Sequence, residues 1–354
     1  MRPADTSREQ LLPLSTDPEL RRRFMVLREP IPGNFRFGVL LEVLDRLAGE
    51  TALQYIWRTI PDAGTVTAAL DEVVVRGVPD VNADVRCSAR INHVGRTSME
   101  VGIRVESAAD HTHLASCYFT MVARNREGTR SIEIPALELA DELDRVRAGR
   151  AMARRAAYRQ ELETAVEPPT REEFMLLSGL HRAQEAPAFS GLRAADLVTE
   201  TWERTYPEQE NPWNAIFGGY IMRRAYELST ICAERISGHG HRPVIAAVNR
   251  INFFHPVLIG DKLHLSSRIA YTDGPAICVE TTIERISRDR TVRALSNSCL
   301  FTFIDLDAAL RPAGVPPVHP ATYAEDARYL AARRNLQALA SRSAKGWLLS
   351  DLRR

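Results

Sequence analysis

Residues 34–41 read NFRFGVLL and residues 214–222 read NAIFGGYIM, and each stretch opens an apolar segment long enough for a helix. The glycines within the two stretches, Gly38 and Gly219, stand 181 positions apart (219 − 38 = 181). The same strand-like runs follow both openings: PDVNAD (79–84), SARI (88–91) and FTMV (119–122) after the first, and PVLIGD (256–261), SSRI (266–269) and FTFI (301–304) after the second. Because four ordered landmarks repeat with offsets from 177 (256 − 79) to 182 (301 − 119), the sequence predicts two copies of one domain in one chain.

The bulk composition fits this division and narrows the class of protein. A length of 354 residues suits two domains of ordinary size, and 45% apolar with 26% charged residues is typical of a globular protein in water. A net charge of +1, with no Lys/Arg run interleaved with aromatic residues, argues against a nucleic-acid partner. The five cysteines form no CxxC pair and sit mostly inside apolar runs, which favours buried, reduced thiols.

The first residues give no sign of a targeting segment. Residues 1–23 mix Asp5, Glu9, Asp17 and Glu19 with arginines and lack an apolar core, unlike a secretory signal or an acid-poor transit peptide. No apolar stretch approaches the length of a membrane span. We therefore expect a cytoplasmic protein with no membrane span.

Hydrophobic periodicity predicts one long helix followed by an antiparallel meander in each copy. A helix that is apolar on most faces must be covered, and a curled sheet can cover it. The predicted fold is therefore α+β, a tandem of hotdog folds in which an antiparallel sheet wraps a long central helix, fused as a pseudo-dimer. In the first copy we expect an extended segment at 25–28, a helix at about 38–57 and strands at 65–70, 73–75, 85–91, 99–105 and 114–123. In the second copy we expect an extended segment at 197–202, a helix at about 218–237 and strands near 244–254, 262–270, 276–285 and 292–304.

The remaining segments complete the predicted domain organisation. The divisions are an N-terminal extension (1–24), a first hotdog domain (25–127), a helical connector (128–196), a second hotdog domain (197–308) and a C-terminal helical tail (309–354). The connector carries arginines at 145, 147, 150, 154 and 155 among acidic residues, so we expect them on a solvated helix face rather than in an anion site.

Two motifs resemble a known family. The run NxIFGGYxMRxAYEL at 214–228 and the run RFGxxLExLD at 36–45 are similar to the two helix openings of double-hotdog acyl-CoA thioesterases, in particular the mitochondrial long-chain-type group. The similarity covers roughly residues 25–308. It implies an enzyme that hydrolyses acyl-CoA to a carboxylic acid and CoA, needs no cofactor or metal, and assembles as a homo-oligomer, a trimer of double hotdogs.

The glycines of the second opening are candidates for binding the reacting carbonyl. Thioester hydrolysis needs a base for water and donors for the developing oxyanion, and the first N–H groups of a helix are unpaired and partly positive. Gly218 and Gly219 have no side chain, so a carbonyl oxygen can approach the backbone there. The alternative is that they only permit a tight turn or close packing.

Asp45 is the candidate base, seven residues after Gly38 in an otherwise apolar helix. In related thioesterases an acid on this helix works with an Asn or Gln that precedes the partner helix. The resemblance carries these roles over to Asp45 and to Asn214, whose amide would orient the water. The alternative is that Asp45 belongs to the solvated stripe of an amphipathic helix, with Glu42, Arg46 and Gly49.

The reverse combination of the two copies lacks an acid. Aligning Gly38 with Gly219 puts Tyr226 opposite Asp45, and the nearest acid of the second copy is one residue, or about 100° around the helix, out of phase. A second site built from Asn34, Gly38 and Tyr226 is therefore predicted to be degenerate.

Two further features concern the coenzyme and the rival reactions. The turn VGRTS (94–98) resembles a turn near CoA in hotdog thioesterases, so Arg96, Thr97 and Ser98 are candidates for CoA binding, the alternative being a hairpin without a ligand. His255 resembles the histidine of hotdog dehydratases, but the partner acid and the glycine-rich context of those enzymes are not evident. A hydratase or dehydratase of enoyl or hydroxyacyl thioesters, and a non-catalytic acyl-thioester binder, are the alternative functions. The sequence shows no Walker loop, GxSxG elbow or metal-ligand cluster.

Overall fold

The computed structural model describes residues 1–28, 34–77, 79–163, 167–211, 213 and 215–342. The chain forms two compact units. Unit 1 comprises Met1–Ala165, Tyr206–Arg223 and Arg250–Ile259, and unit 2 comprises Val166–Thr205, Arg224–Asn249 and Gly260–Arg354. Unit 1 therefore contains the first sequence copy together with two short segments of the second copy.

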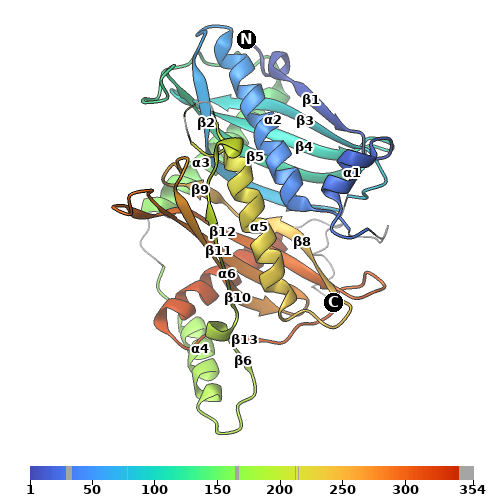
Figure 1. The fold of residues 1–354 in the computed structure, drawn as a ribbon, viewed down its shortest axis with the longest axis vertical. Helices are drawn as coiled ribbons and strands as arrows, with labels where there is room; N and C mark the ends of the chain where they lie inside the picture. The colour runs from blue at the N-terminus through green and yellow to red at the C-terminus, as the bar shows by residue number, and fades with distance from the viewer. Residues whose placement is uncertain (29–33, 78, 164–166, 212, 214, 343–354) are drawn as a thin grey trace. The chain divides into compact units, whose positions relative to one another are not determined.

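Unit 1 is an antiparallel sheet with a long helix along one face (Figure 1). Its elements are η1 (Pro3–Thr6), β1 (Arg8–Leu12), α1 (Pro18–Phe24), α2 (Phe37–Trp57), β2 (Gly64–Val75), β3 (Val85–Val94), β4 (Ser98–Ser107), β5 (His113–Arg124), α3 (Glu142–Glu163), η3 (Pro207–Gln209) and β9 (Ile251–Phe253). The strand order is β1-β3-β4-β5-β2, with β9 paired to β2. The helix α2 packs against β2, β3, β4 and β5, because its apolar side chains, including Leu40, Leu44 and Leu47, need cover from water.

Unit 2 has the same plan. Its elements are α4 (Arg171–Gln184), β6 (Leu192–Arg193), η2 (Ala194–Asp196), β7 (Val198–Arg204), most of α5 (Gly218–Glu234), β8 (Arg242–Val248), β10 (Lys262–Asp273), β11 (Ala276–Ile286), β12 (Arg293–Leu306), β13 (Val318–His319) and α6 (Tyr323–Arg342). The sheet order is β8-β12-β11-β10-β7. From Arg224 onward α5 lies along this sheet (Figure 1), and Tyr226 packs its ring against Phe301 and Phe303. The helix α6 packs on β10 and β11.

The tandem α+β hotdog fold predicted from the sequence is confirmed, and three local expectations change. Residues 65–70 and 73–75 form the single strand β2, interrupted by two register shifts. Residues 244–254 divide into the two strands β8 and β9. Residues 25–28 are not a strand; the edge strand of unit 1 is β1, which pairs with β3. Hydrophobic periodicity does not predict β1, because its five residues, REQLL, carry no apolar alternation.

The helix α3 covers a face of the unit 1 sheet through charged side chains. Arg154 donates to Glu100 on β4 from Nε at 2.9 Å and from Nη2 at 2.6 Å, and its guanidinium lies 3.7 Å from the ring centre of Tyr118 on β5. Arg90 on β3 donates to Asp144 at 2.5 Å. The expectation that all five connector arginines are solvated is therefore wrong for Arg154, because its partner Glu100 is buried in the sheet.

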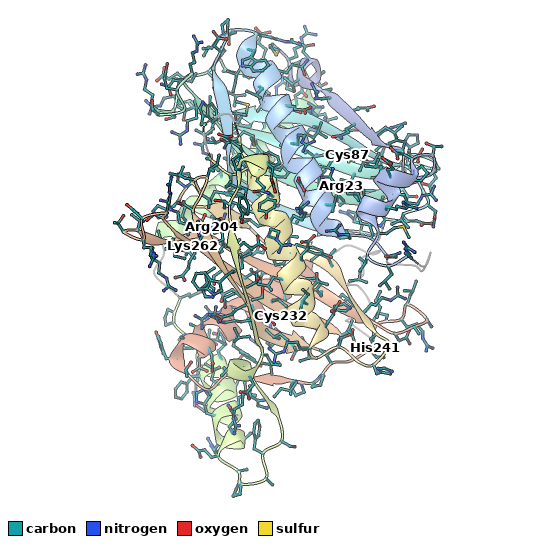
Figure 2. The ribbon with its side chains drawn as sticks, viewed as in Figure 1. Arg23, Cys87, Arg204, Cys232, His241 and Lys262 are labelled. Atoms are coloured by element: carbon teal, nitrogen blue, oxygen red, sulfur yellow. The ribbon has the colours of Figure 1, made fainter. Side chains whose placement is uncertain are left out.

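All five cysteines are free thiols in buried positions, as their apolar sequence context indicated. Figure 2 labels Cys87 on β3 and Cys232 on α5; the Cys232 thiol lies 3.5 Å from the carbonyl oxygens of Leu197 and Ser267. Burial raises the pKa of Cys87 and Cys278 to about 12, so these side chains are packing groups rather than nucleophiles.

Two properties of the described residues bear on partners. None of the helices there is long and apolar enough to cross a membrane. Within the same residues, no group of three His, Cys, Asp or Glu side chains could hold a metal ion.

The α3 interface yields a stability prediction. Glu100→Ala leaves the Arg154 guanidinium partly buried without its anion, so we expect the free energy of unfolding to fall by about 3 kcal/mol. Arg145→Ala removes an exposed ion pair to Glu142 on the same helix, with side chains 58% and 81% exposed, and should cost less than about 0.5 kcal/mol. Urea unfolding followed by circular dichroism measures both values. Equal costs for the two variants would contradict the role given to Glu100.

Candidate active site

Asp45 is a buried carboxylic acid in the middle of the apolar helix α2. It is 1% exposed, and its helix neighbours Leu41, Leu44 and Ala48 are fully buried. The alternative of a solvated stripe is therefore wrong for Asp45, although Arg46, the next residue, is exposed. A polar group at such a position requires hydrogen-bond partners, since burying it without them is costly.

Each oxygen of the Asp45 carboxylate accepts one hydrogen bond. The backbone N–H of Gly219, at the start of α5, donates to Oδ2 at 2.7 Å. The hydroxyl of Thr67 on β2 donates to Oδ1 at 2.7 Å. The register of β2 against β5 shifts between Thr67 and Ala69, so a β-bulge next to the acid directs the Thr67 side chain towards it.

The two glycines at the start of α5 allow its backbone to touch α2. A Cβ atom on Gly219 would lie 2.9 Å from Cα and 3.1 Å from the carbonyl oxygen of Glu42. A Cβ atom on Gly218 would lie 3.3 Å from Oδ2 of Asp45 and 3.2 Å from the ring of Phe253. Close packing therefore does require a glycine at 219, and it also brings the N-terminus of the helix onto the acid.

The backbone N–H groups of these glycines differ in what they bind. The N–H of Gly219 is used by Asp45, whereas the N–H of Gly218 makes no hydrogen bond within the part of the chain that the structure describes. At a helix N-terminus such a free donor carries partial positive charge. Among the described residues, Gly218 is thus the one of the two candidates whose N–H is not already used by the protein.

The environment of Asp45 changes its acidity. Burial raises the pKa of Asp45 from its ordinary value of 3.8 to about 6, and the nearby negative charge of Glu42 adds a smaller increase. The hydrogen bonds from Thr67 and Gly219 act in the opposite direction. A carboxylate with this pKa is mostly ionised at pH 7 and is a stronger base than an exposed aspartate, which suits general-base chemistry.

The segment that enters α5 is fixed to unit 1 by Trp213. Its indole Nε1 donates to the carbonyl of Arg126 at 3.0 Å. The ring occupies space next to Gly64 and Gly128, where a Cβ atom would lie 1.9 Å and 2.6 Å from it, and Gly128 has φ +69°. Asn214, the candidate for orienting water, lies outside the described residues.

The residues of the predicted second site have other roles. The Asn34 side chain accepts hydrogen bonds from the backbone N–H groups of Val26 and Leu27 at 2.7 and 2.8 Å and donates to the carbonyl of Leu27 at 2.7 Å, so it shapes the chain before α2. Gly38 is buried in the first turn of α2. Tyr226 is buried in unit 2, where burial raises the pKa of its hydroxyl and keeps it protonated.

The candidate coenzyme residues lie at the hairpin between β3 and β4. Arg96 is exposed, 3.6 Å from Glu133, and the carbonyl of Thr97 accepts from the backbone of β5. Ser98 is buried at the start of β4, and its hydroxyl has no partner within the described residues. Arg155 of α3 adjoins the same turn, since a Cβ on Gly95 would lie 2.6 Å from its Nη1.

Two residues bear on how well sequence reasoning can locate a site. The sequence does not distinguish Thr67, because it is one threonine among several in a β-branched run, and only the bulge of β2 gives its side chain a special direction. His255, the residue that suggested a dehydratase, lies exposed beyond the end of β9.

Known proteins with similar sequences are thioesterases. The model of the thioesterase superfamily matches residues 214–292. Acyl-coenzyme A thioesterase 9, mitochondrial, of Homo sapiens is 30% identical over 356 residues, covering 95% of this chain and 78% of the relative. Acyl-coenzyme A thioesterase 2, chloroplastic, of Humulus lupulus is 28% identical over 365 residues, covering 95% and 81%.

A solved structure supports the fold. The crystal structure of a putative oleoyl thioesterase from Lactobacillus plantarum superposes with a TM-score of 0.51 at 11% identity, covering 84% of this chain and 95% of that one. With the relatives that span almost the whole chain, these findings show that this protein belongs to the double-hotdog acyl-CoA thioesterases, a family of thioester hydrolases.

Proposed function

We propose that this enzyme hydrolyses acyl-CoA to a carboxylic acid and CoA, with Asp45 as the general base for the attacking water. The observation that carries the proposal is the buried Asp45 carboxylate at the N-terminus of α5, 2.7 Å from the N–H of Gly219 and beside Gly218, whose N–H makes no hydrogen bond among the described residues. Relatives of this chain are named acyl-coenzyme A thioesterases, which supports acyl-CoA as the substrate.

The chemistry follows from these groups. Asp45 takes a proton from water, and the water oxygen attacks the carbonyl carbon of the thioester. The carbonyl oxygen becomes an oxyanion, which the N–H of Gly218 and the positive end of α5 stabilise. The tetrahedral intermediate collapses, the C–S bond breaks, and the thiolate of CoA recovers the proton from Asp45. The hydrogen bonds from Thr67 and Gly219 hold the carboxylate in one orientation throughout.

The site is composite in sequence, because it joins groups of both copies. Asp45 and Thr67 come from the first copy, and Gly218 and Gly219 come from the second. We assign the orientation of the water to the amide of Asn214, which directly follows the anchored Trp213 in sequence. The family resemblance supports this role.

The opposite pairing of the two copies, in which the second copy would supply the base, lacks an acid equivalent to Asp45. A protonated Tyr226 in an apolar environment cannot accept a proton from water, and the Asn34 amide already binds the backbone of residues 26 and 27. One working site per chain is the consequence.

The hairpin between β3 and β4 is the candidate site for the coenzyme. The exposed Arg96 and the adjoining Arg155 offer guanidinium groups to the phosphates of CoA, and Thr97 lies between the hairpin strands.

The first test of the function is removal of the base. Asp45→Asn keeps the size of the side chain and should lower kcat by roughly 10²–10⁴, the usual worth of a positioned general base. Release of CoA thiol from acyl-CoA substrates of several chain lengths measures the loss. Glu50→Gln on the same helix removes an exposed carboxylate paired with Arg8 and should leave kcat unchanged. Near-normal turnover in a folded Asp45→Asn protein would exclude the proposed mechanism.

The raised pKa of Asp45 predicts how rate and stability vary with pH. Activity should rise through about pH 6, where the base loses its proton. Because the pKa in the folded state exceeds the ordinary 3.8, the wild type loses stability as the pH rises from about 4 to 6, and the loss is then constant. The difference between an Asp45 pKa of 3.8 and one of about 6 corresponds to about 3 kcal/mol. Asp45→Asn should therefore melt at a higher temperature than wild type at pH 8 but not at pH 4; the reverse order at pH 8 would contradict the burial argument.

The glycine contact gives a third prediction. Gly219→Ala places a methyl group against the backbone of Glu42, so α5 must move away and the hydrogen bond to Asp45 is lost. We expect kcat to fall by about 10²-fold, comparable to the loss of an oxyanion donor. The matched control is Gly49→Ala in α2, where the nearest atom to a Cβ is 4.0 Å away, so activity should persist. Similar activity in both alanine variants would show that contact between the two helices is not needed.

A further inference from the structure

A second polar contact joins α2 to the beginning of α5, one turn from Asp45. The guanidinium Nη1 of Arg223 donates to Oε2 of Glu42 at 2.9 Å, and the two side chains are only 23% and 12% exposed. Glu42 precedes Asp45 by three residues on α2, and Arg223 follows Gly219 by four residues on α5. The bond between Asp45 and Gly219 and the ion pair between Glu42 and Arg223 are therefore two braces about one helical turn apart.

The two members of the ion pair are the same position of the sequence repeat. Their separation (223 − 42 = 181) equals that of Gly38 and Gly219, so each residue contacts its own counterpart. In two identical copies related by a twofold axis, a residue on that axis meets a copy of itself, and a charged residue there would meet a like charge. Opposite charges at this position exist only because the two copies have diverged within one chain.

The surroundings hold the pair in place. Arg23 at the end of α1, labelled in Figure 2, brings a second guanidinium to 3.6 Å from Oε1 of Glu42. The Arg223 guanidinium carbon lies 5.3 Å from the ring centre of Tyr220, and its Nε is buried with no hydrogen-bond partner in the described part of the chain. Arg223 thus depends on Glu42 for its hydrogen bonding among these residues, and breaking a partly buried pair of this kind leaves a poorly solvated charge.

We propose that Glu42 and Arg223 are a positioning pair for Asp45, which holds the N-terminus of α5 against the acid and offsets the negative charge of Glu42 beside it. The inference rests on the proposed role of Asp45 and deepens it. Neither residue is proposed to touch the substrate. The contact of the Gly219 backbone with that of Glu42 supports the first part, because the pair closes the same junction one turn farther along.

The charged groups around Asp45 support the proposed electrostatic role of the pair. On its own helix they are Glu42 and the solvent-exposed Arg46, α1 supplies Arg23, and α5 supplies Arg223. The strand side chains at the acid are Thr67, and Met121 behind it, both uncharged. Glu42 by itself raises the pKa of Asp45. Arg223 places the opposite charge 2.9 Å from Glu42, so we expect it to oppose that effect.

Opposite charge changes should therefore shift the pH profile in opposite directions. In Glu42→Gln the cation of Arg223 remains, so the acidic limb of kcat should move to lower pH by roughly half a unit. In Arg223→Gln the anion of Glu42 remains, so the limb should move to higher pH by a similar amount. The double variant should return close to the wild-type midpoint, while kcat falls about tenfold because the brace is lost. Arg223→Lys should keep the midpoint and lose part of kcat, since it keeps the charge without the fork geometry.

The control is the adjacent Arg224→Gln. Arg224 is similarly exposed but pairs with Glu203 and Glu227 in unit 2, so its removal should leave the midpoint in place. Infrared difference spectra give a readout that needs no turnover, because the carboxylic-acid band that disappears in Asp45→Asn reports the titration of Asp45 directly. Thermal unfolding of each variant shows which ones are folded.

Several outcomes would overturn the positioning pair. They are unchanged midpoints and kcat in both single variants, shifts of the same sign, or a shift in Arg224→Gln equal to that in Arg223→Gln. If either glutamine variant does not fold, Arg223→Lys and Glu42→Asp decide the matter, since unaltered kcat in both would reject the brace. Failure of the proposed function looks different: Asp45→Asn would stay active while the infrared titration of Asp45 still shifted in the Glu42 and Arg223 variants.

Discussion

The structure around the site depends on one constraint: a carboxylate in an apolar helix must be satisfied by donors that do not come from water. Asp45 meets this requirement with one hydroxyl and one backbone N–H, and the N–H is at the start of a second helix. The requirement explains the other features of the junction. The two helices must touch, so position 219 is a glycine, and β2 must present a hydroxyl at one point, so its ladder is interrupted there.

Much of this could be predicted from the sequence, and the limits have physical reasons. The repeat and the two long helices follow from periodicity, whereas the candidate roles of Gly218, Gly219 and Asp45 follow from the resemblance to double-hotdog thioesterases. The role of Thr67 does not, because a bulge is a property of strand pairing rather than of composition. The strand β1 was missed because an edge strand needs little apolar alternation. The partners Glu42 and Arg223 lie 181 residues apart, and no local pattern joins them.

Fusion of two copies in one chain removes the requirement that equivalent positions be identical. Two pairs of counterparts show what this freedom allows. Position 45 is an acid in the first copy, and its counterpart Tyr226 is a buried aromatic residue that packs on Phe301 and Phe303. Position 42 is an anion, and its counterpart Arg223 is a cation that binds it. Under the proposed mechanism the first difference leaves one base per chain, and the second places opposite charges where identical copies would place like charges.

The same arrangement explains why the acid is costly and why that cost is useful. Burial disfavours the charged form of Asp45, so the folded enzyme is less stable at neutral pH than it would be with a neutral side chain there. Water activation needs that same charge to be poorly solvated, since a well-hydrated carboxylate is a weak base. The two hydrogen bonds and the neutral pair of Glu42 and Arg223 limit the cost without abolishing the basicity. A stronger donor set would lower the pKa of Asp45 and stabilise the fold, but it would also weaken the base, so the modest number of donors is itself part of how the site works.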